Sequence, residues 1–507
     1  MDWKKLLGRA MILASCFLST SCGGGGGGAT ATTTTSVEAT STTTVIDTTT
    51  SGASTTSTSA AVGTTTTIGS TTSTTLLSGE LLSPGDLIYL GAFRLPERAP
   101  GAPDAQGWEW SGEGLAYNPD GDPSDSGDGY PGSLFAAGLQ SDNYVAEISI
   151  PAPVVSKNLD DLNVAGTLQG LTDIRSGYFE AFDEIPRMGM EVLPQQAGQS
   201  SAKLYLSWGQ HFQDNATTMI PSHAWCDLDL SKPNTMGSWW VGDADMLYSV
   251  NAYMFAIPSD WAAAHVGGRM LGTGRFRDGG WSGKGPSLYA IGPWLDGAPP
   301  SAGASLSYVP LLQYSNTRGD DTTDYTLTDY KHSDEWEGGA WLSSGSKSAV
   351  VFVGTKGSGY TWYGFFSPAG DGVPCVADYI TDMVNCYNPD GTVCSAELRG
   401  YCDGHSPESR GWWNSRFDAQ MIFYNPDDLA AVAAGTMQPY EPQPYAILDI
   451  DEHLILGPTD DPILHGSGDQ RRYRLGEPAY DRARGFLYVL ERQADGSKPV
   501  IHVWSVN

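Results

Sequence analysis

Short apolar runs bounded by Gly, Pro, Asp or Asn dominate the chain from Leu81 onward. Each run is about four to eight residues long, and no segment shows a long apolar period of 3.6 residues. Runs of this kind are typical of β-strands, because helices need longer periodic segments to bury one face. The pattern therefore predicts an all-β fold for this part of the chain.

One group of three runs recurs five times along the chain. The first strands of the five copies are expected at residues 114–119, 189–194, 252–258, 338–342 and 478–481. The second strands are expected at 133–138, 204–209, 269–272, 349–354 and 485–490, and the third at 145–151, 223–228, 287–291, 419–426 and 500–504. An internal repeat of this length indicates a fold built from similar units.

A fourth run follows every copy except the last, at residues 168–174, 239–242, 308–314 and 445–450. An unmatched run at 87–93 stands ahead of the first copy. This arrangement resembles the ring closure of β-propellers, in which radial repetition hides the sheet edges. We therefore predict a β-propeller of five four-stranded blades, with the N-terminal strand closing the last blade. A ring of six or seven blades with degenerate copies and an array of β-sandwiches are the alternatives.

The N-terminal 21 residues have the pattern of a secretory signal, since Lys4, Lys5 and Arg9 precede an apolar run and small residues lead up to Cys22. Cys22 and the six Gly after it resemble the processing site of bacterial lipoproteins, in which the cysteine becomes the lipidated first residue. A cleaved signal without a lipid is the alternative. The resemblance implies a protein of the cell envelope, anchored at the outer membrane or cell surface, that contacts the membrane only through its acyl (palmitate) chains.

The predicted organisation follows from these segments. Residues 1–21 form the signal, residues 22–79 comprise the lipidated cysteine and a disordered Gly/Thr/Ser tether, and residues 80–507 form the propeller. An insertion at about 367–416 separates the second and third strands of the fourth copy.

The insertion contains four cysteines, Cys375, Cys386, Cys394 and Cys402. Their spacing lacks the CxxC pairs of structural zinc sites, and four cysteines in a loop-rich stretch of an exported protein indicate two disulfides. The pairing stays open. Cys226 follows Trp225 in an expected strand and is predicted to be a buried free thiol.

Charge restricts the partners of the protein. Asp and Glu number 58 against 28 Lys and Arg, which gives a formal net charge of −30. A surface that binds phosphate backbones has to be basic, so nucleic acid is excluded as a partner.

Two carboxylates take the same place in different copies. When the copies are aligned on their small and aromatic residues, Glu113 of the first copy falls with Glu337 of the fourth, at the end of the strand that would line the central channel. A pair of carboxylates facing one cavity suits glycoside hydrolysis, in which one acts as acid and the other as base or nucleophile. The alternative is that both accept hydrogen bonds from backbone amides.

The fold resembles that of five-bladed glycoside hydrolases that act on arabinans, xylans and fructans. Those families use an Asp, Asp, Glu set, and this sequence has no matching Asp at the start of the first blade. The resemblance is therefore one of fold only.

Aromatic and polar residues are densest beside these carboxylates and in the insertion. Indole faces stack on sugar rings while polar groups bind hydroxyls, so the sequence predicts a glycan site. Its expected ligand-binding residues are Trp108, Trp110, His332, Glu335, Trp336, His405 and Arg410. The alternative is that the aromatic loops pack on one another.

An acidic loop follows the first strand of the first copy. Asp120, Asp122 and Asp125 alternate like the oxygen donors of a calcium loop, although the loop lacks the Gly and the final acidic residue of an EF-hand. Calcium is the cofactor that the sequence suggests, and a solvated turn is the alternative.

Taken together, these features predict an exported, lipid-anchored β-propeller that binds an extracellular ligand, a glycan in the first instance. The alternative is a polysaccharide-degrading enzyme, either a glycoside hydrolase or a lyase, that acts at the central cavity.

Overall fold

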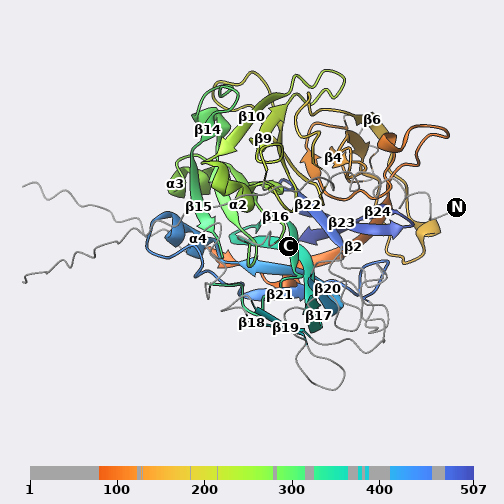
Figure 1. Ribbon diagram of the computed structural model, residues 1–507. Helices are drawn as coiled ribbons and strands as arrows, with labels where there is room; N and C mark the ends of the chain where they lie inside the picture. The colour runs from red at the N-terminus through yellow and green to blue at the C-terminus, as the bar shows by residue number, and fades with distance from the viewer. Residues whose placement is uncertain are drawn as a thin grey trace, which may run out of the picture. The chain divides into compact units, whose positions relative to one another are not determined.

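Five small antiparallel sheets form a ring in the part of the chain that the computed structural model describes (Figure 1). That part comprises residues 79–122, 127, 129–182, 184–213, 215–277, 283–314, 325–363, 375–378, 383–386, 412–458 and 474–507, without the side chains of 360–363, 375–378, 383–386, 412, 413 and 415. The ring is a five-bladed β-propeller, which confirms the predicted fold and blade number.

Each blade has four consecutive strands, named here from the channel outward. Blade one contains β3 (Leu115–Asn118), β4 (Ser133–Ala137), β5 (Val145–Ser149) and β6 (Thr167–Thr172), and blade two contains β7 (Arg187–Leu193), β8 (Lys203–Gly209), β9 (His223–Cys226) and β10 (Met236–Val241). Blade three contains β11 (Tyr253–Ala256), β12 (Leu271–Gly274), β13 (Leu288–Ile291) and β15 (Tyr308–Leu312). Blade four contains β16 (Glu335–Ser344), β17 (Lys347–Tyr363), β20 (Trp412–Tyr424) and β21 (Ala446–Asp449), and blade five contains β22 (Leu475–Asp481), β23 (Phe486–Asp495), β24 (Lys498–Val506) and β2 (Leu87–Arg94).

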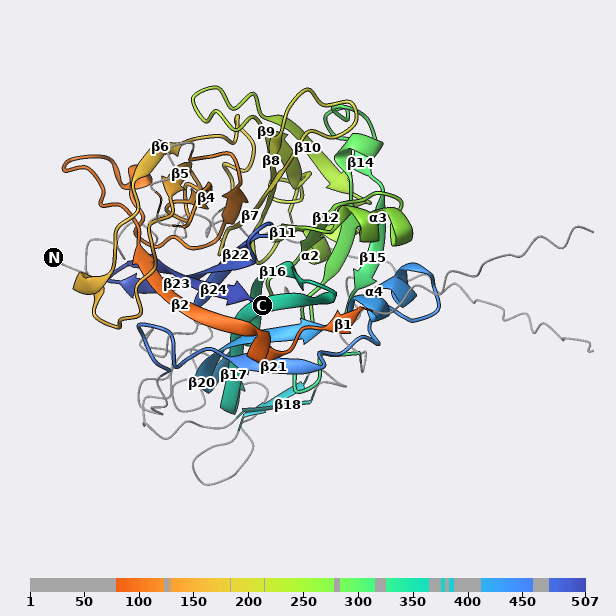
Figure 2. The ribbon, with the colours of Figure 1, turned by 180° about the vertical axis from the view of Figure 1, so that it is seen from behind.

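The ring closes between the two ends of the propeller. Strand β2 pairs antiparallel with β24, from Leu87 opposite Val506 to Arg94 opposite Val500, so the N-terminal strand completes the last blade as predicted (Figure 2). The inner strands contact one another in the cyclic order β3, β7, β11, β16 and β22. They approach closely, because a Cβ on Gly189 would lie 2.4 Å from the Cα of Tyr253.

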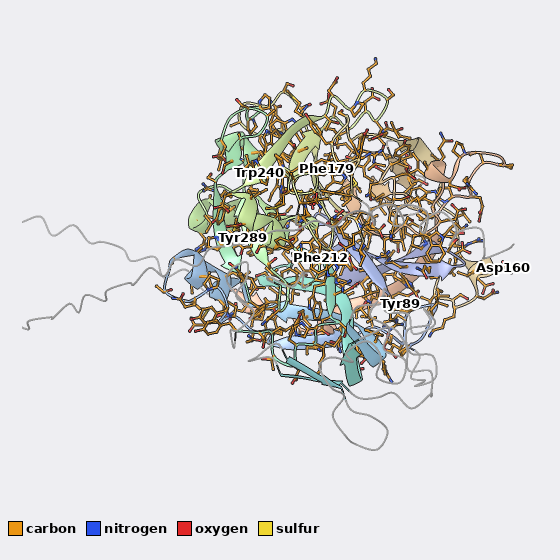
Figure 3. All side chains as sticks on the ribbon, in the orientation of Figure 1. Tyr89, Asp160, Phe179, Phe212, Trp240 and Tyr289 are labelled. Atoms are coloured by element: carbon orange, nitrogen blue, oxygen red, sulfur yellow. The ribbon has the colours of Figure 1, made fainter. Side chains whose placement is uncertain are left out.

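Hydrophobic cores lie between neighbouring blades and hold the ring together. Between blades one and two, Phe135 and Ala116 are buried with Met190, Leu206 and Trp208. Both faces of the middle strands are covered, which explains why these strands are continuous apolar runs. Figure 3 shows side chains filling the space between blades, with Trp240 on β10 and Tyr289 on β13 marking blades two and three.

Several short elements were not predicted. Strand β1 (Glu80–Leu81) adds in parallel to β17, and β14 (Ser305–Leu306) adds in parallel to β10. Helices α2 (Leu247–Val250), α3 (Ser259–His265) and α4 (Pro426–Ala433) lie in the connections. Helix α4 begins where the side chain of Asn425 accepts a hydrogen bond from the backbone of Asp427. None of the helices in the described ranges is long and apolar enough to cross a membrane.

The insertion leaves blade four between β17 and β20, both of which extend beyond the predicted runs. It contains the hairpin β18 (Cys375–Asp378) and β19 (Met383–Cys386), in which Cys375 stands opposite Cys386. The side chains of these two cysteines, and residues Cys394 and Cys402, lie outside the described part, so the two disulfides stay a prediction. Cys226 is buried and free, as predicted.

The N-terminal predictions also fall outside the described residues. They comprise the signal at residues 1–21, the lipidated Cys22 and the tether, and they stay predictions.

Candidate functional site

A cluster of buried charges occupies the end of the channel at which the inner strands begin. Glu113 directly precedes β3, Arg187 opens β7, and Glu335 and Glu337 lie at the start of β16. We call this group the charged cluster and define it by Glu113, Arg187, Arg277, Glu335, Glu337 and Arg492. The cluster matches three guanidinium groups with three carboxylates.

Arg187 is the central cation of the charged cluster. Its Nε and Nη2 donate to Glu337 Oε2 and Oε1 at 2.9 and 3.2 Å, a bidentate pair. Its Nη1 lies 3.9 Å from Glu113 Oε1, and its Nη2 lies 4.0 Å from Glu335 Oε2. The guanidinium also stacks over the ring of Phe276, with Cζ 4.5 Å from the centroid. Three carboxylates from blades one and four therefore surround one cation from blade two.

Arg492 of β23 makes the second link between the two predicted catalytic residues. Its Nη2 donates to Glu113 Oε1 at 2.7 Å and to Gln140 Oε1 at 3.0 Å, and its Nη1 lies 3.7 Å from Glu337 Oε1. Glu113 and Glu337 are thus brought together, as their equivalent positions in the repeat predicted. Both are engaged by guanidinium groups from other blades rather than by backbone amides alone.

Burial sets the electrostatics of the charged cluster. The side chains of Glu113, Glu337 and Arg187 are no more than 2 % exposed. Burial raises the pKa of Glu113, although Arg492 and Arg187 act in the opposite direction. Burial also disfavours the charged form of Arg187, but Glu337, Glu113 and Glu335 together raise its pKa above the ordinary value.

The aromatic residues predicted to bind glycan are placed differently from one another. Trp108 and Trp336 are buried members of two hydrophobic cores. Trp110 is exposed, with a positive φ of 59°. His332 is buried edge-on against Tyr330, with ring centroids 5.4 Å apart. His405 and Arg410 lie outside the described residues, and no aromatic surface around the charged cluster can be assembled from the others.

Glu477 of β22 closes the middle of the channel. Its Oε2 accepts hydrogen bonds from the backbone N–H of Leu115 at 3.0 Å and of Met190 at 3.1 Å, and its Oε1 accepts one from Met254 at 2.9 Å. One carboxyl group therefore joins the inner strands of blades one, two and three to blade five. Burial raises its pKa, while the three N–H donors oppose that shift.

A cavity of about 380 Å³ lies at the other end of the channel, where all five inner strands end. We call it the axial cavity. Its walls include the aromatic residues Tyr117, Phe255, Trp341 and Tyr480, together with aliphatic residues from β7 and β11. Glu191 and Arg482 are the ionisable groups considered below, and Asp260 and Asp481 also reach its wall.

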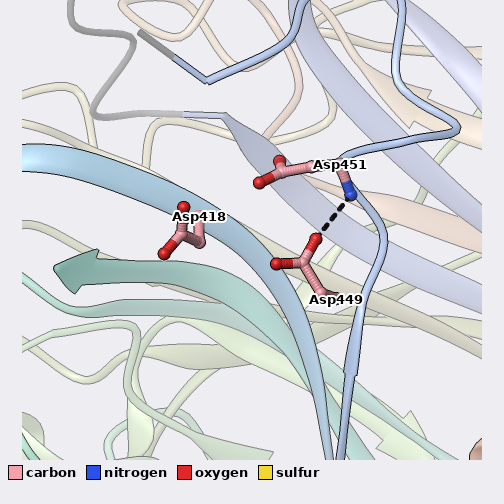
Figure 4. Close-up of side chains that lie close together, drawn as sticks. All are labelled: Asp418, Asp449 and Asp451. Carbon is pink, nitrogen blue, oxygen red and sulfur yellow. Dashed lines mark hydrogen bonds between the residues drawn. The ribbon is translucent and has the colours of Figure 1, made fainter. Parts of the chain in front are cut away.

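Three carboxylates outside the channel form an acidic cluster at the base of blade four. Ligand atoms of Asp418, Asp449 and Asp451 lie within 4.8 Å of one another, and the backbone N–H of Asp451 donates to Asp449 at 2.9 Å (Figure 4). Arg416 pairs with Asp418, and Arg474 pairs with Asp451. These two cations offset most of the negative charge, so we assign no metal to the cluster.

The predicted calcium loop cannot be judged as a whole. Asp120 and Asp122 belong to the described residues, whereas Asp125 does not. Asn118, at the start of the loop, donates to Glu147 at 2.9 Å. Calcium binding therefore stays a prediction.

Sequence reasoning missed the partners of the predicted residues and the second end of the channel. Arg187 stands one position before the residue that aligns with Glu113, and Glu477 one position after it, so an alignment one residue wider would have included both. Arg492 and Arg482 lie on or beyond other strands, and no local pattern connects them to the channel.

The comparisons with known proteins add no relative from which a function could be transferred. No protein-family model matches the chain, and a search of curated proteins finds no match to it. The chain is therefore characterised by its fold and by the geometry of its channel.

Proposed function

We propose that the protein is an exported, lipid-anchored binding protein whose propeller holds part of an extracellular glycan in the axial cavity. The observation that carries the proposal is the cavity itself, which lies on the axis of the ring and has aromatic walls contributed by four blades. Pockets with mainly apolar walls and a few polar groups are the usual form of small-ligand sites.

The dimensions and chemistry of the axial cavity support a sugar ligand. Its volume of about 380 Å³ falls near the lower end of the roughly 300–1,000 Å³ of such sites. Aromatic rings cover the apolar face of a sugar, while carboxyl and guanidinium groups bind its hydroxyls. A short glycan segment or a chain end fits these requirements.

The state of the charged cluster favours binding over hydrolysis. A glycoside hydrolase needs two carboxylates that can reach the bond to be cleaved, with one able to give up or accept a proton. Glu113 and Glu337 are buried and held in ion pairs by Arg187 and Arg492. The binding role is therefore the better supported of the two.

A Trp at the rim of the axial cavity should block ligand uptake. Ser259 is exposed, opens α3 and lines the cavity. In the variant Ser259→Trp we expect binding of a responsive glycan to weaken at least tenfold, because the indole fills the opening. The measurement is a glycan array on the full-length chain, followed by calorimetric titration of the best ligand.

The matched control is Ser301→Trp, which adds the same side chain at an exposed position away from the cavity. It should bind like the wild type. Equal affinity of Ser259→Trp and the wild type would contradict a binding role for the axial cavity.

One observation supports hydrolysis as the second candidate. Burial raises the pKa of Glu113, whose Oε2 accepts no hydrogen bond from the described residues, while Glu337 is held as a bidentate ion pair. Carboxylates in such different surroundings can divide the roles of acid and base.

If the charged cluster cleaves glycans, replacing either carboxylate should abolish turnover. We expect Glu113→Gln and Glu337→Gln each to lower the rate at least a hundredfold, because general acid or base catalysis contributes about 10²–10⁴-fold. Release of reducing sugar from a polysaccharide panel measures this. Unchanged rates in both folded variants would exclude the enzyme hypothesis.

A further inference from the structure

An arginine without a carboxylate partner lines the axial cavity. Arg482 follows the last residue of β22, and its Nη2 donates to the carbonyl oxygen of Ala256 at 3.0 Å. Its Nη1 is buried and has no hydrogen-bond partner among the described residues. No carboxylate in the described ranges lies within 4.0 Å of its nitrogens, the distance at which ion pairs are assigned.

The nearby acidic groups do not balance this cation. Asp481 is buried and occupied by its own turn, since its Oδ1 accepts from the N–H groups of Ala483 and Arg484 and its Oδ2 accepts from Arg484 Nη1. Asp260 is exposed in the first turn of α3. Arg482 therefore lacks the ion pair that normally accompanies a buried guanidinium.

Glu191 of β7 faces the same cavity as a neutral group. Its Oε2 accepts a hydrogen bond from the N–H of Ala256 at 3.1 Å, so Glu191 and Arg482 hold the same peptide from its two sides. Burial raises the pKa of Glu191 to about 8, even though Arg482 opposes the shift. At neutral pH its carboxyl group is therefore protonated and can donate a hydrogen bond to a ligand.

We propose that the axial cavity recognises a carboxylate, carried by an acidic sugar such as a uronic acid, through an ion pair with Arg482. The proposal rests on the proposed binding function and names the chemical class of its ligand. A single hydrogen bond, to Ala256, anchors the guanidinium, so it can turn to form a bidentate pair with the ligand. The ring of the sugar packs on the aromatic walls, and Glu191 donates to a ligand oxygen.

The overall acidity of the protein does not oppose this local pairing. The net charge of −30 slows the approach of anions at low salt. Exposed charges more than about 10 Å away are largely screened at 0.1 M salt. The contact with Arg482 forms inside the cavity, where screening is weak.

Titration of the full-length chain with three small probes tests the proposal. The probes are glucuronate, glucose and cyclohexanecarboxylate, which separate the contribution of the carboxylate from that of the sugar. We expect glucuronate to bind at least tenfold more tightly than glucose. Equal binding of glucuronate and cyclohexanecarboxylate would support carboxylate recognition and overturn the assignment to a sugar.

Arginine variants identify the recognising group. Arg482→Gln should lose at least tenfold in affinity for glucuronate and nothing for glucose, and Arg482→Lys should lose less because it keeps the charge. The control is Arg484→Gln, since Arg484 is two residues away, 43 % exposed, and not part of the cavity wall. Thermal midpoints of all variants show whether they fold.

The pH dependence gives a second readout. Glucuronate stays ionised between pH 6 and 9, as do Arg482, Asp260 and Asp481, while Tyr117 and Tyr480, whose pKa values are raised mainly by burial, stay neutral. Glu191 alone changes charge in this range, so wild-type affinity should fall as pH rises through about 8. In Glu191→Gln the affinity should not change with pH.

The outcomes separate the two proposals. Absence of binding by every sugar probe and every arrayed glycan would contradict the proposed function as a whole. Binding of neutral glycans that Ser259→Trp abolishes and Arg482→Gln leaves unchanged would overturn carboxylate recognition alone.

Discussion

Replacing Glu477 by Ala is expected to lower the free energy of unfolding by at least about 4 kcal/mol, because a buried donor left without a partner costs about 1–3 kcal/mol. The substitution leaves three backbone N–H groups unpaired, those of Leu115, Met190 and Met254. It also empties a fully buried volume at the point where four blades meet. Guanidinium denaturation followed by tryptophan fluorescence measures the loss.

Glu477→Gln tests the physical cause. The amide keeps one oxygen in place to accept the bonds from Leu115 and Met190, but its NH₂ group faces the N–H of Met254. Its loss of stability should therefore lie between those of the wild type and the Ala variant. Glu452→Ala is the control, because that side chain is 81 % exposed, and it should leave the denaturation midpoint unchanged. A Glu477→Ala midpoint equal to that of the control would refute the central role of Glu477.

Replacing Arg187 by Met is expected to destabilise the protein by about 3–5 kcal/mol at pH 7, the usual result of removing one partner from buried ion pairs. Glu337 loses its bidentate partner, and Glu113 and Glu335 lose a cation within 4.0 Å. Met fills much of the volume of Arg, so the loss reflects uncompensated charge and not a cavity. Denaturation at pH 7 measures the effect.

The deficit of the Arg187→Met variant should shrink as the pH falls. Burial already raises the pKa of Glu113 in the wild type, and removing Arg187 raises it further in the folded state only. A carboxyl group with a raised folded pKa binds protons more tightly in the native than in the unfolded state, so its contribution to stability is present below the unfolded pKa of about 4.3. That contribution is lost as the pH rises through the folded pKa.

Denaturation of Arg187→Met and wild type at pH 5 and pH 7 tests the sign. Arg98→Met provides the control, since Arg98 pairs with the largely exposed Asp104 and should show little change at either pH. A deficit of Arg187→Met that stays constant between the two pH values would contradict the electrostatic account.

The strands of the propeller could be predicted because their signal is local. The run at residues 87–93 stands ahead of the first copy, and the fifth copy lacks a fourth run, so ring closure followed from counting. Strands β1 and β14 escaped prediction, since each contributes only two residues to a sheet. Two residues carry no alternation that a pattern could detect.

The candidate site could be predicted only in part. The repeat placed Glu113 and Glu337 at equivalent positions, and the structure brings them together. Their partners come from other blades: 150 residues separate Arg187 from Glu337, and 379 separate Arg492 from Glu113. Such pairs leave no mark in local periodicity, so the buried ion pairs could not be foreseen.

The sequence by itself determined the architecture, because apolar runs of strand length, their turns and their fivefold repetition are properties of neighbouring residues. The tertiary structure decided which end of the channel is filled by charges and which holds a cavity. It did so because Glu477 closes the middle of the channel, Arg187 neutralises three carboxylates at one end, and Arg482 is left without a carboxylate partner at the other. These contacts depend on the packing of inner strands from all five blades, which only the closed ring brings together.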